Sequence, residues 1–322
     1  MADLAIDRPA NPPRARVFDG LFQGATWFFA VFILLLLAAV LASLVVGALP
    51  ALRKFGWGFV VSSSWNPVTE QFGALPAIAG TLITSSIAML IGIPVAFGIA
   101  LFITELCPPV LRRPIGVLIE LLAAIPSIIY GIWGLFVFAP MFQQTVEPVL
   151  NDVFGDVPIV GALLSGPPIG IGMLTAGLIL SIMVIPFIAA VMRDVFELVP
   201  PLLKESAYGL GSTTWEVVWR VVLPYTKVGV IGGVMLGLGR ALGETMAVTF
   251  VIGNAHQLAV SLMAPGNSIA SALANEFTEA VGDLYTSSLV ALGALLFLIT
   301  FSVIAAARYM LLRLERRALS SV

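Results

Sequence analysis

The sequence predicts an all-α integral membrane protein, a bundle of about six transmembrane helices. Of its 322 residues, 59% are hydrophobic and only 11% are charged, whereas soluble proteins average about 45–50% apolar and about 25% charged residues. The mean hydropathy is +1.05. Apolar stretches of about 20 residues, the length that a helix needs to cross a bilayer, recur along the chain. These observations exclude a soluble domain built around a single core.

The apolar stretches give the predicted spans, and their even number puts both termini on one side of the membrane. We place the spans at residues 27–50, 77–104, 115–139, 168–192, 228–252 and 285–307. Pro126 is expected to kink the third of them. The predicted transmembrane domain covers residues 20–310, between an N-terminal tail of residues 1–19 and a C-terminal tail of residues 311–322.

The basic residues predict which side that is. Most of the 16 Lys and Arg residues lie in the two tails and in the connections on the same side, whereas the opposite side carries only Arg53 and Lys54. Cytoplasmic segments are enriched in Lys and Arg. Both termini are therefore predicted to be cytoplasmic. Glu120, near the start of the third span, is expected to snorkel or to pair with Arg112, Arg113 or Arg193.

Several kinds of chemistry are excluded by composition. With one cysteine, Cys107, and one histidine, His256, the chain cannot build a disulfide framework, a Cys/His metal cage or a lipid phosphatase site. None of the lysines follows glycine, so the phosphate-cradling motif G-x-x-x-x-G-K is absent. No basic run with interleaved aromatics predicts nucleic-acid binding. We predict no cofactor, no metal and no catalytic residue.

The connection at residues 193–227 is long and reads as structured. Glu205–Leu210 suits a short helix, Gly211 can end it in the left-handed conformation, and Thr213-x-x-Glu216 is a capping box that starts a second helix. The second helix carries an apolar stripe, and Pro224 is expected to stop it. The stripe, formed by Trp215, Val218, Trp219 and Val222, suits the lipid surface and a protein partner about equally.

The spacing around Gly211 fits a known pattern, E-A-A, three residues, G, nine residues, I-x-L-P. The matching positions are Glu205, Ala207, Gly211, Val221, Leu223 and Pro224. Ser206 replaces the second residue of the triad, and Val221 replaces the isoleucine. The segment resembles the coupling loop of permease subunits of binding-protein-dependent ABC importers. The resemblance implies a type I importer bundle that is not itself an enzyme. Its loop, with Trp215 on the second helix, would dock on a separate ATPase.

The fifth predicted span holds a charged pair. Arg240 lies about twelve residues, or about 18 Å, into this span. A charge at this depth costs at least about 2.5–3.5 kcal/mol and must face protein or water. Glu244 follows at i+4, so the two side chains can neutralise each other. Alternatively, Arg240 binds an oxyanion in transit, while Glu244 keeps the arginine in position and prevents the anion from binding too tightly. A ridge of Gly229, Gly233 and Gly237 is expected to place this helix against a partner subunit or the pore.

Two segments, Gly237–Asn254 and Ala124–Leu135, resemble the PstC family of phosphate-specific permease subunits. The resemblance implies that Arg240 and Glu244 take part in phosphate passage across a bacterial inner membrane. It also implies three partners besides the lipid bilayer: a second permease subunit (PstA-like), a dimer of ATP-binding subunits (PstB-like) and a periplasmic phosphate-binding protein (PstS-like). Two alternatives stay open, a permease for sulfate or molybdate and a proton-coupled secondary transporter.

Overall fold

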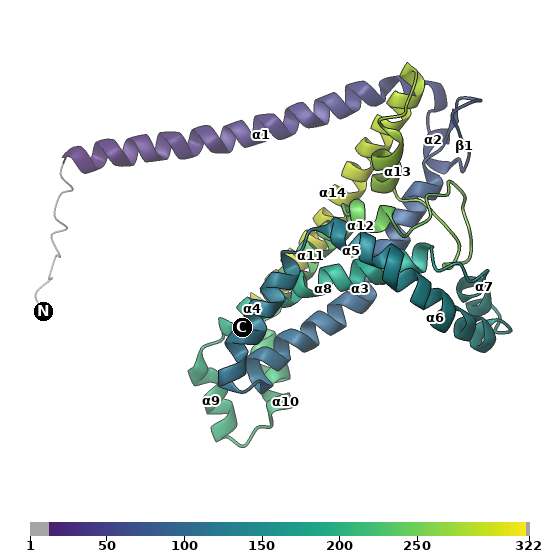
Figure 1. Ribbon diagram of the computed structural model, residues 1–322. Coiled ribbons are helices and arrows are strands. Elements are labelled where there is room, and N and C mark those ends of the chain that lie inside the picture. The colour runs from purple at the N-terminus through teal and green to yellow at the C-terminus, as the bar shows by residue number, and fades with distance from the viewer. Residues whose placement is uncertain (1–12, 320–322) are drawn as a thin grey trace, which may run out of the picture. The chain divides into compact units, whose positions relative to one another are not determined.

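The computed structural model describes residues 13–319, with side chains for residues 18–313 (Figure 1). The predicted tail of residues 1–19 therefore lies largely outside the described residues, as does the end of the C-terminal tail. The chain divides into two compact units, Met1–Gly47 and Ala48–Val322. The described part of the first unit is the N-terminal part of one long helix.

The second unit is mostly helical. The helices of the chain are α1 (Pro13–Phe55), α2 (Gly58–Val61), α3 (Leu75–Leu101), α4 (Pro109–Ala123), α5 (Ser127–Trp133), α6 (Ala139–Phe154), α7 (Val160–Leu164), α8 (Met173–Glu197), α9 (Pro201–Gly209), α10 (Thr214–Val217), α11 (Leu223–Leu242), α12 (Met246–Thr249), α13 (Ile269–Glu276) and α14 (Asp283–Leu319). Single π-helical turns extend α3, link α5 to α6 and link α10 to α11, at Phe102–Leu106, Gly134–Phe138 and Val218–Val222. A short antiparallel hairpin pairs β1 (Trp65–Asn66) with β2 (Gln71–Phe72).

Five stretches of the described chain are long and apolar enough to cross a membrane, and there are six if one bent pair counts as a single span. The five are Phe18–Phe55, Leu75–Leu106, Met173–Glu197, Thr214–Leu242 and Asp283–Arg313. The predicted bundle of about six transmembrane helices is thereby confirmed.

The third predicted span is broken rather than kinked. Pro109–Ala123 and Ser127–Phe154 meet at 84°. Pro126 disfavours helical backbone at the residue before it, so α4 ends and α5 begins on the far side of the proline. The Tyr130 hydroxyl donates a hydrogen bond to the Leu122 carbonyl at 2.9 Å and so bridges the break.

The fifth predicted span, 228–252, starts and ends too late. The helical stretch runs from Thr214 to Leu242, and the separate short helix α12 follows a break. Pro224 does not stop the helix as predicted, because it lies in the first turn of α11, where its missing N–H is not needed. Gly243 ends α11. The loop helix and the fifth span are therefore continuous.

Helices α3, α8 and α11 carry the main core. Core side chains of α8 such as Met183, Ile188 and Phe196 are almost fully buried. The glycine ridge of α11 faces this helix, because a Cβ on Gly237 would lie 2.5 Å from Ile188 Cδ1. Gly229 and Gly233 approach α8 side chains in the same way. The ridge packs within the chain, so the expectation that it faces a partner or the pore is wrong.

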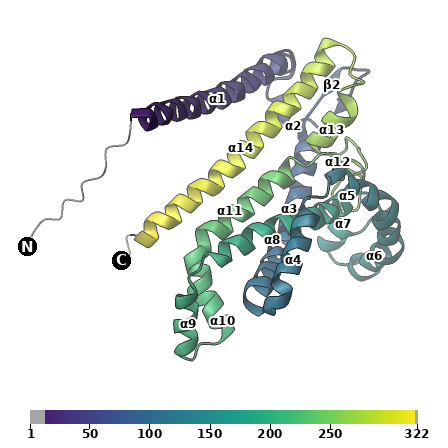
Figure 2. The same ribbon diagram turned by 60° about the vertical axis from the view of Figure 1, so that its left-hand side comes forward.

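A second core lies at the opposite end of this unit. It joins the hairpin to α13 and the start of α14, with Phe72, Ile269 and Leu289 almost fully buried. Both views place α9 and α10 at one end and the hairpin with α13 at the other (Figures 1 and 2). The two groups of candidate residues therefore belong to different levels of the bundle, one at its α9–α10 end and the other where α11 breaks.

Candidate functional site

Arg240 lies in the last turn of α11, three residues before the helix break. Its Nε is buried and has no hydrogen-bond partner among the described residues. The guanidinium carbon lies 5.5 Å from the centre of the Phe187 ring of α8, a distance at which a cation is attracted to an aromatic face. No carboxylate of the described chain lies within 4.0 Å of this guanidinium. The guanidinium is therefore left without a protein carboxylate among the described residues.

Glu244 does not pair with Arg240, because the helix that would align them ends at Leu242. Its carboxylate instead accepts a hydrogen bond from the Ala247 backbone N–H at 3.2 Å. This bond caps the first turn of α12. The structure thus brings the predicted residues to one break in the backbone but separates their charges.

The α9–α10 segment (residues 200–224) contains the residues of the predicted loop motif. Glu205 is exposed on α9, whereas Ala207 is partly buried and packs on the main core. Gly211 has φ +85°, which confirms its predicted left-handed conformation. The predicted capping box between Thr213 and Glu216 is also present.

The predicted apolar stripe of this segment splits into two faces. Val218 and Val222 are buried, but Trp215 and Trp219 are 67% and 49% exposed. Their rings pack against each other at 5.2 Å between centres. The three remaining motif residues lie where the segment joins α11, with Val221 and Leu223 packed on the core and Pro224 exposed. The exposed tryptophans leave an aromatic surface on this end of the bundle.

The sequence analysis missed an ion pair that joins this segment to α3. Lys204 Nζ of α9 lies 2.5 Å from Glu105 Oε1 on the π-helical turn after α3. Their side chains are only 18% and 6% exposed. The two residues are 99 positions apart in the chain, so no local spacing signals the contact.

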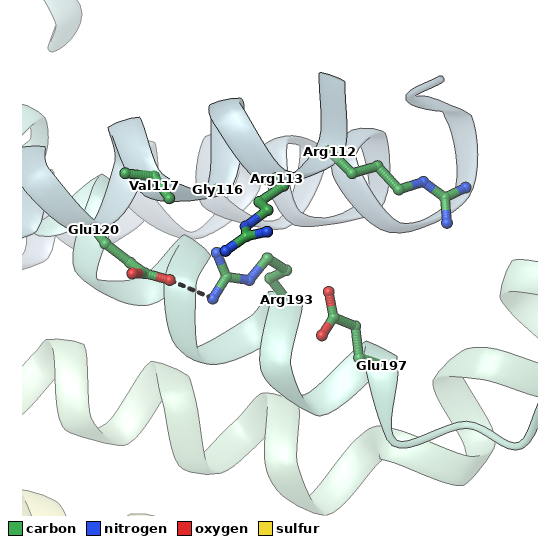
Figure 3. Close-up of a pocket in the computed structure, with 7 residues that line it drawn as sticks. All are labelled: Arg112, Arg113, Gly116, Val117, Glu120, Arg193 and Glu197. Carbon is green, nitrogen blue, oxygen red and sulfur yellow. Dashed lines mark hydrogen bonds and ion pairs between the residues drawn. The ribbon is translucent and has the colours of Figure 1, made fainter. Parts of the chain in front are cut away.

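A cavity of about 380 Å³ lies between α4 and α8 near the same end (Figure 3). Arg193 donates hydrogen bonds to Glu120 and Asp194, each at 2.7 Å. The expectation that Glu120 pairs with an arginine is confirmed for Arg193. Arg112 and Glu197 face the same space. Among the described residues that line the cavity, the ion pair between Arg193 and Glu120 is the one that links α8 to α4.

A polar cluster around Glu276 holds the opposite end together. Its carboxylate contacts His256 and accepts hydrogen bonds from Trp65 Nε1 and the Tyr285 hydroxyl, each at 2.7 Å. Burial raises the pKa of the Glu276 carboxyl, but the bonds from these three side chains outweigh burial and hold that pKa below its ordinary value. The His256 ring also stacks on Trp65. Among the described residues, no group of His, Cys, Asp and Glu side chains is arranged to hold a metal ion.

The sequence is similar to a family of membrane transport proteins. Residues 92–316 match the family described as "Binding-protein-dependent transport system inner membrane component". The "Phosphate transport system permease protein PstC" of Mesorhizobium japonicum is 60% identical over 310 residues, which is 96% of this chain and 95% of that protein. The protein of the same name from Pasteurella multocida is 61% identical over 301 residues, or 94% of each chain.

Solved structures share the fold. A chain of a bacterial ABC transporter that imports the acidic polysaccharide alginate superposes with a TM-score of 0.57 at 17% identity, covering 93% of this chain and 96% of that chain. The alginate transporter in complex with an alginate pentasaccharide-bound periplasmic protein gives a TM-score of 0.58 at 17% identity, covering 94% of this chain and 96% of that chain. At this identity the likeness concerns the fold alone.

Proposed function

Given that the chain belongs to the PstC family of phosphate transport permease proteins within the binding-protein-dependent inner membrane components, we propose that Arg240 and Glu244 form its phosphate pathway. We propose further that the α9–α10 segment couples transport to ATP hydrolysis in a separate subunit. The termini are then cytoplasmic, and the predicted boundaries of residues 20–310 describe the membrane domain.

The unpartnered Arg240 is the observation that carries the pathway proposal. A guanidinium presents a planar fork of donors that matches an oxyanion, and in a low-dielectric span such donors demand a partner. The arginine is already stabilised by the Phe187 ring, so it is held in place without being neutralised. Phosphate would thus find a cation that needs no protein contact broken first.

Glu244 gives this site a means of favouring phosphate. Near neutral pH phosphate keeps a proton, which it can donate to a carboxylate, whereas fully ionised sulfate is repelled. Among the described residues, the Glu244 carboxylate accepts one hydrogen bond, from the Ala247 N–H to Oε1, so its second oxygen can accept another. Attraction by Arg240 and restraint by Glu244 together suit transient binding.

The coupling proposal is supported by the surface of the α9–α10 segment. Glu205, Trp215 and Trp219 are exposed on a segment that is continuous with α11 through a π-helical turn. A push on this segment would travel along one helix to Arg240. The expected partners are a PstA-like permease, a PstB-like ATPase dimer and a PstS-like binding protein.

Two other functions remain to be separated by experiment. A permease for sulfate or molybdate would use the same arginine, because tetrahedral oxyanions present similar oxygens. A proton-coupled transporter would use Glu244 as its proton carrier and would leave the α9–α10 segment without a partner.

Uptake into proteoliposomes that hold the assembled importer separates these functions. We expect labelled phosphate to enter only with ATP and the binding protein, and excess sulfate to leave uptake unchanged. A protonophore should also have no effect. Entry of sulfate in place of phosphate would favour the first alternative. Uptake that needs no ATP and collapses with the proton gradient would favour the second.

A further inference from the structure

We propose that the Lys204–Glu105 ion pair is a tether that transmits movement of α9 to α3 during transport, which makes both residues positioning residues of the transport cycle. The inference rests on the proposed function, because a docked ATPase supplies the movement. The ion pair would give the movement a second path into the bundle, besides the continuous helix that joins α10 to α11.

Helix α9 is held loosely to the bundle. None of its side chains is fully buried. Only Lys204 and Ala207 are partly buried, and their i,i+3 spacing puts them on one face of the helix. Pro200 precedes the helix, and Gly211, whose φ is +85°, follows it. The helix can therefore tilt as a body between these two points.

Lys204 provides the polar attachment of α9 to the bundle. Among the described residues, the bond to Glu105 is the one side-chain hydrogen bond or ion pair that links α9 to another helix. At 2.5 Å and with side chains 18% and 6% exposed, the pair is shielded from water. Separating buried opposite charges leaves each of them without compensation, so the contact resists extension.

Glu105, the partner of Lys204, is firmly anchored. It follows Ile103 and Thr104, which are 2% and 7% exposed, on the π-helical turn that continues α3. Helix α3 packs along α8 and also contacts α11. A displacement imposed at Glu105 is thus delivered to the helices that surround Arg240.

The surroundings leave room for such a movement. A cavity of about 400 Å³ lies beside the pair, between α9 and the ends of α3 and α8. Lys204 and Glu105 themselves line it, together with Tyr208 of α9 and with Arg112 and Glu197. Helix α9 can approach the bundle without first displacing packed side chains.

The test uses the complete importer in proteoliposomes and measures phosphate transported per ATP hydrolysed. The variant Glu105→Gln/Lys204→Met removes both charges at once and leaves no unpaired buried charge. We expect ATP hydrolysis within about twofold of wild type and phosphate per ATP lowered at least about fivefold, because the link and not the fold is lost. The reversed pair, Glu105→Lys/Lys204→Glu, should restore at least about half of the wild-type ratio, since the attraction is re-formed.

The matched control is Lys54→Met, which removes an exposed ion pair with Glu70 at 3.1 Å. Exposed pairs contribute little, so its ratio should stay at the wild-type value. An unchanged ratio in the double variant would overturn the tether. A parallel loss of hydrolysis, uptake and assembled complex would also overturn it, because that pattern marks a purely structural role.

A second measurement does not depend on transport. Backbone hydrogen exchange of residues 201–209 in the full chain in nanodiscs should speed up at least about threefold in the neutral double variant and return toward wild type in the reversed pair. Unchanged exchange would contradict the tether. If the wild-type complex transports no phosphate but exchange still speeds up in the neutral double variant, the proposed function is rejected and the link between α9 and α3 is supported.

Discussion

Lys204 and Arg240 are two cations of the same bundle with opposite surroundings. Lys204 lies 2.5 Å from the buried carboxylate of Glu105. Arg240 has no such partner among the described residues, and its Nε is buried without a hydrogen bond. A charge that is already paired can hold two helices together, whereas a charge that is left open can receive a ligand. The contrast separates the end of the bundle that we propose is mechanical from the level at which we propose that the substrate binds.

The largest effect should come from removing the open charge. Arg240→Gln keeps a planar side chain but loses the cation, and we expect phosphate uptake to fall about hundredfold or more, because charge-assisted bonds to the oxyanion are lost. Uptake by the assembled importer measures the effect. Arg240→Lys should retain part of the activity, since the charge remains without the fork. Uptake near wild type in Arg240→Gln at normal complex yield would contradict the comparison.

A smaller effect should come from the mechanical end. Gly211→Val forces a branched side chain into φ +85°, at a strain of about 1–2 kcal/mol. We expect ATP hydrolysis to continue while phosphate uptake falls several-fold. Gly209→Val is the matched control, because open space surrounds both positions and only Gly211 has positive φ. Equal losses in the two variants would remove the special role of the Gly211 conformation.

Packing of the helix that carries Arg240 gives the next prediction. A Cβ on Gly237 would lie 2.5 Å from Ile188, whereas one on Gly239 would lie 3.4 Å from Ile304. Gly237→Ala should therefore destabilise the chain by about 1–3 kcal/mol. Gly239→Ala should be neutral or stabilising by up to about 1 kcal/mol. Unfolding in detergent measures both, and the reverse order would show that α11 does not pack on α8 through Gly237.

The smallest expected effect is on stability in acid and concerns the Glu276 carboxylate, at the end of the bundle that holds the hairpin and α13. The pKa of Glu276 is lower in the folded chain than its unfolded value of about 4.3. Its stabilising contribution is therefore complete above about pH 4.3 and is lost as the pH falls through the folded value. Glu276→Gln should reduce the acid dependence of unfolding, measured from pH 7 to pH 3. The control is Glu279→Gln. If the acid dependence of unfolding is unchanged in Glu276→Gln but reduced in Glu279→Gln, Glu276 is not the carboxylate that stabilises this end of the bundle.

The sequence predicts best where local chemistry decides the structure. The left-handed Gly211 and the Thr213–Glu216 capping box depend on residues within one turn of each other, and both predictions are confirmed. Hydropathy likewise predicts the number of spans, since the bilayer fixes their length.

The breaks and the long-range contacts could not be predicted in the same way. Apolar residues continue on both sides of Gly243 and Glu244, so a continuous helix and a helix break look alike in sequence. The alternative in which Arg240 and Glu244 neutralise each other on one helical face is wrong, because the helix ends at Leu242. The 84° turn at Pro126 exceeds what one proline requires. Lys204 and Glu105 are 99 positions apart and meet through tertiary packing, which no local spacing signals.

The most direct test of the central claim is a structure of the complete importer trapped with phosphate inside the membrane. We expect an oxyanion within hydrogen-bond distance of the Arg240 guanidinium, with Glu244 beside it and the Lys204–Glu105 pair intact. An oxyanion bound elsewhere, together with an Arg240 neutralised by a protein carboxylate, would contradict it.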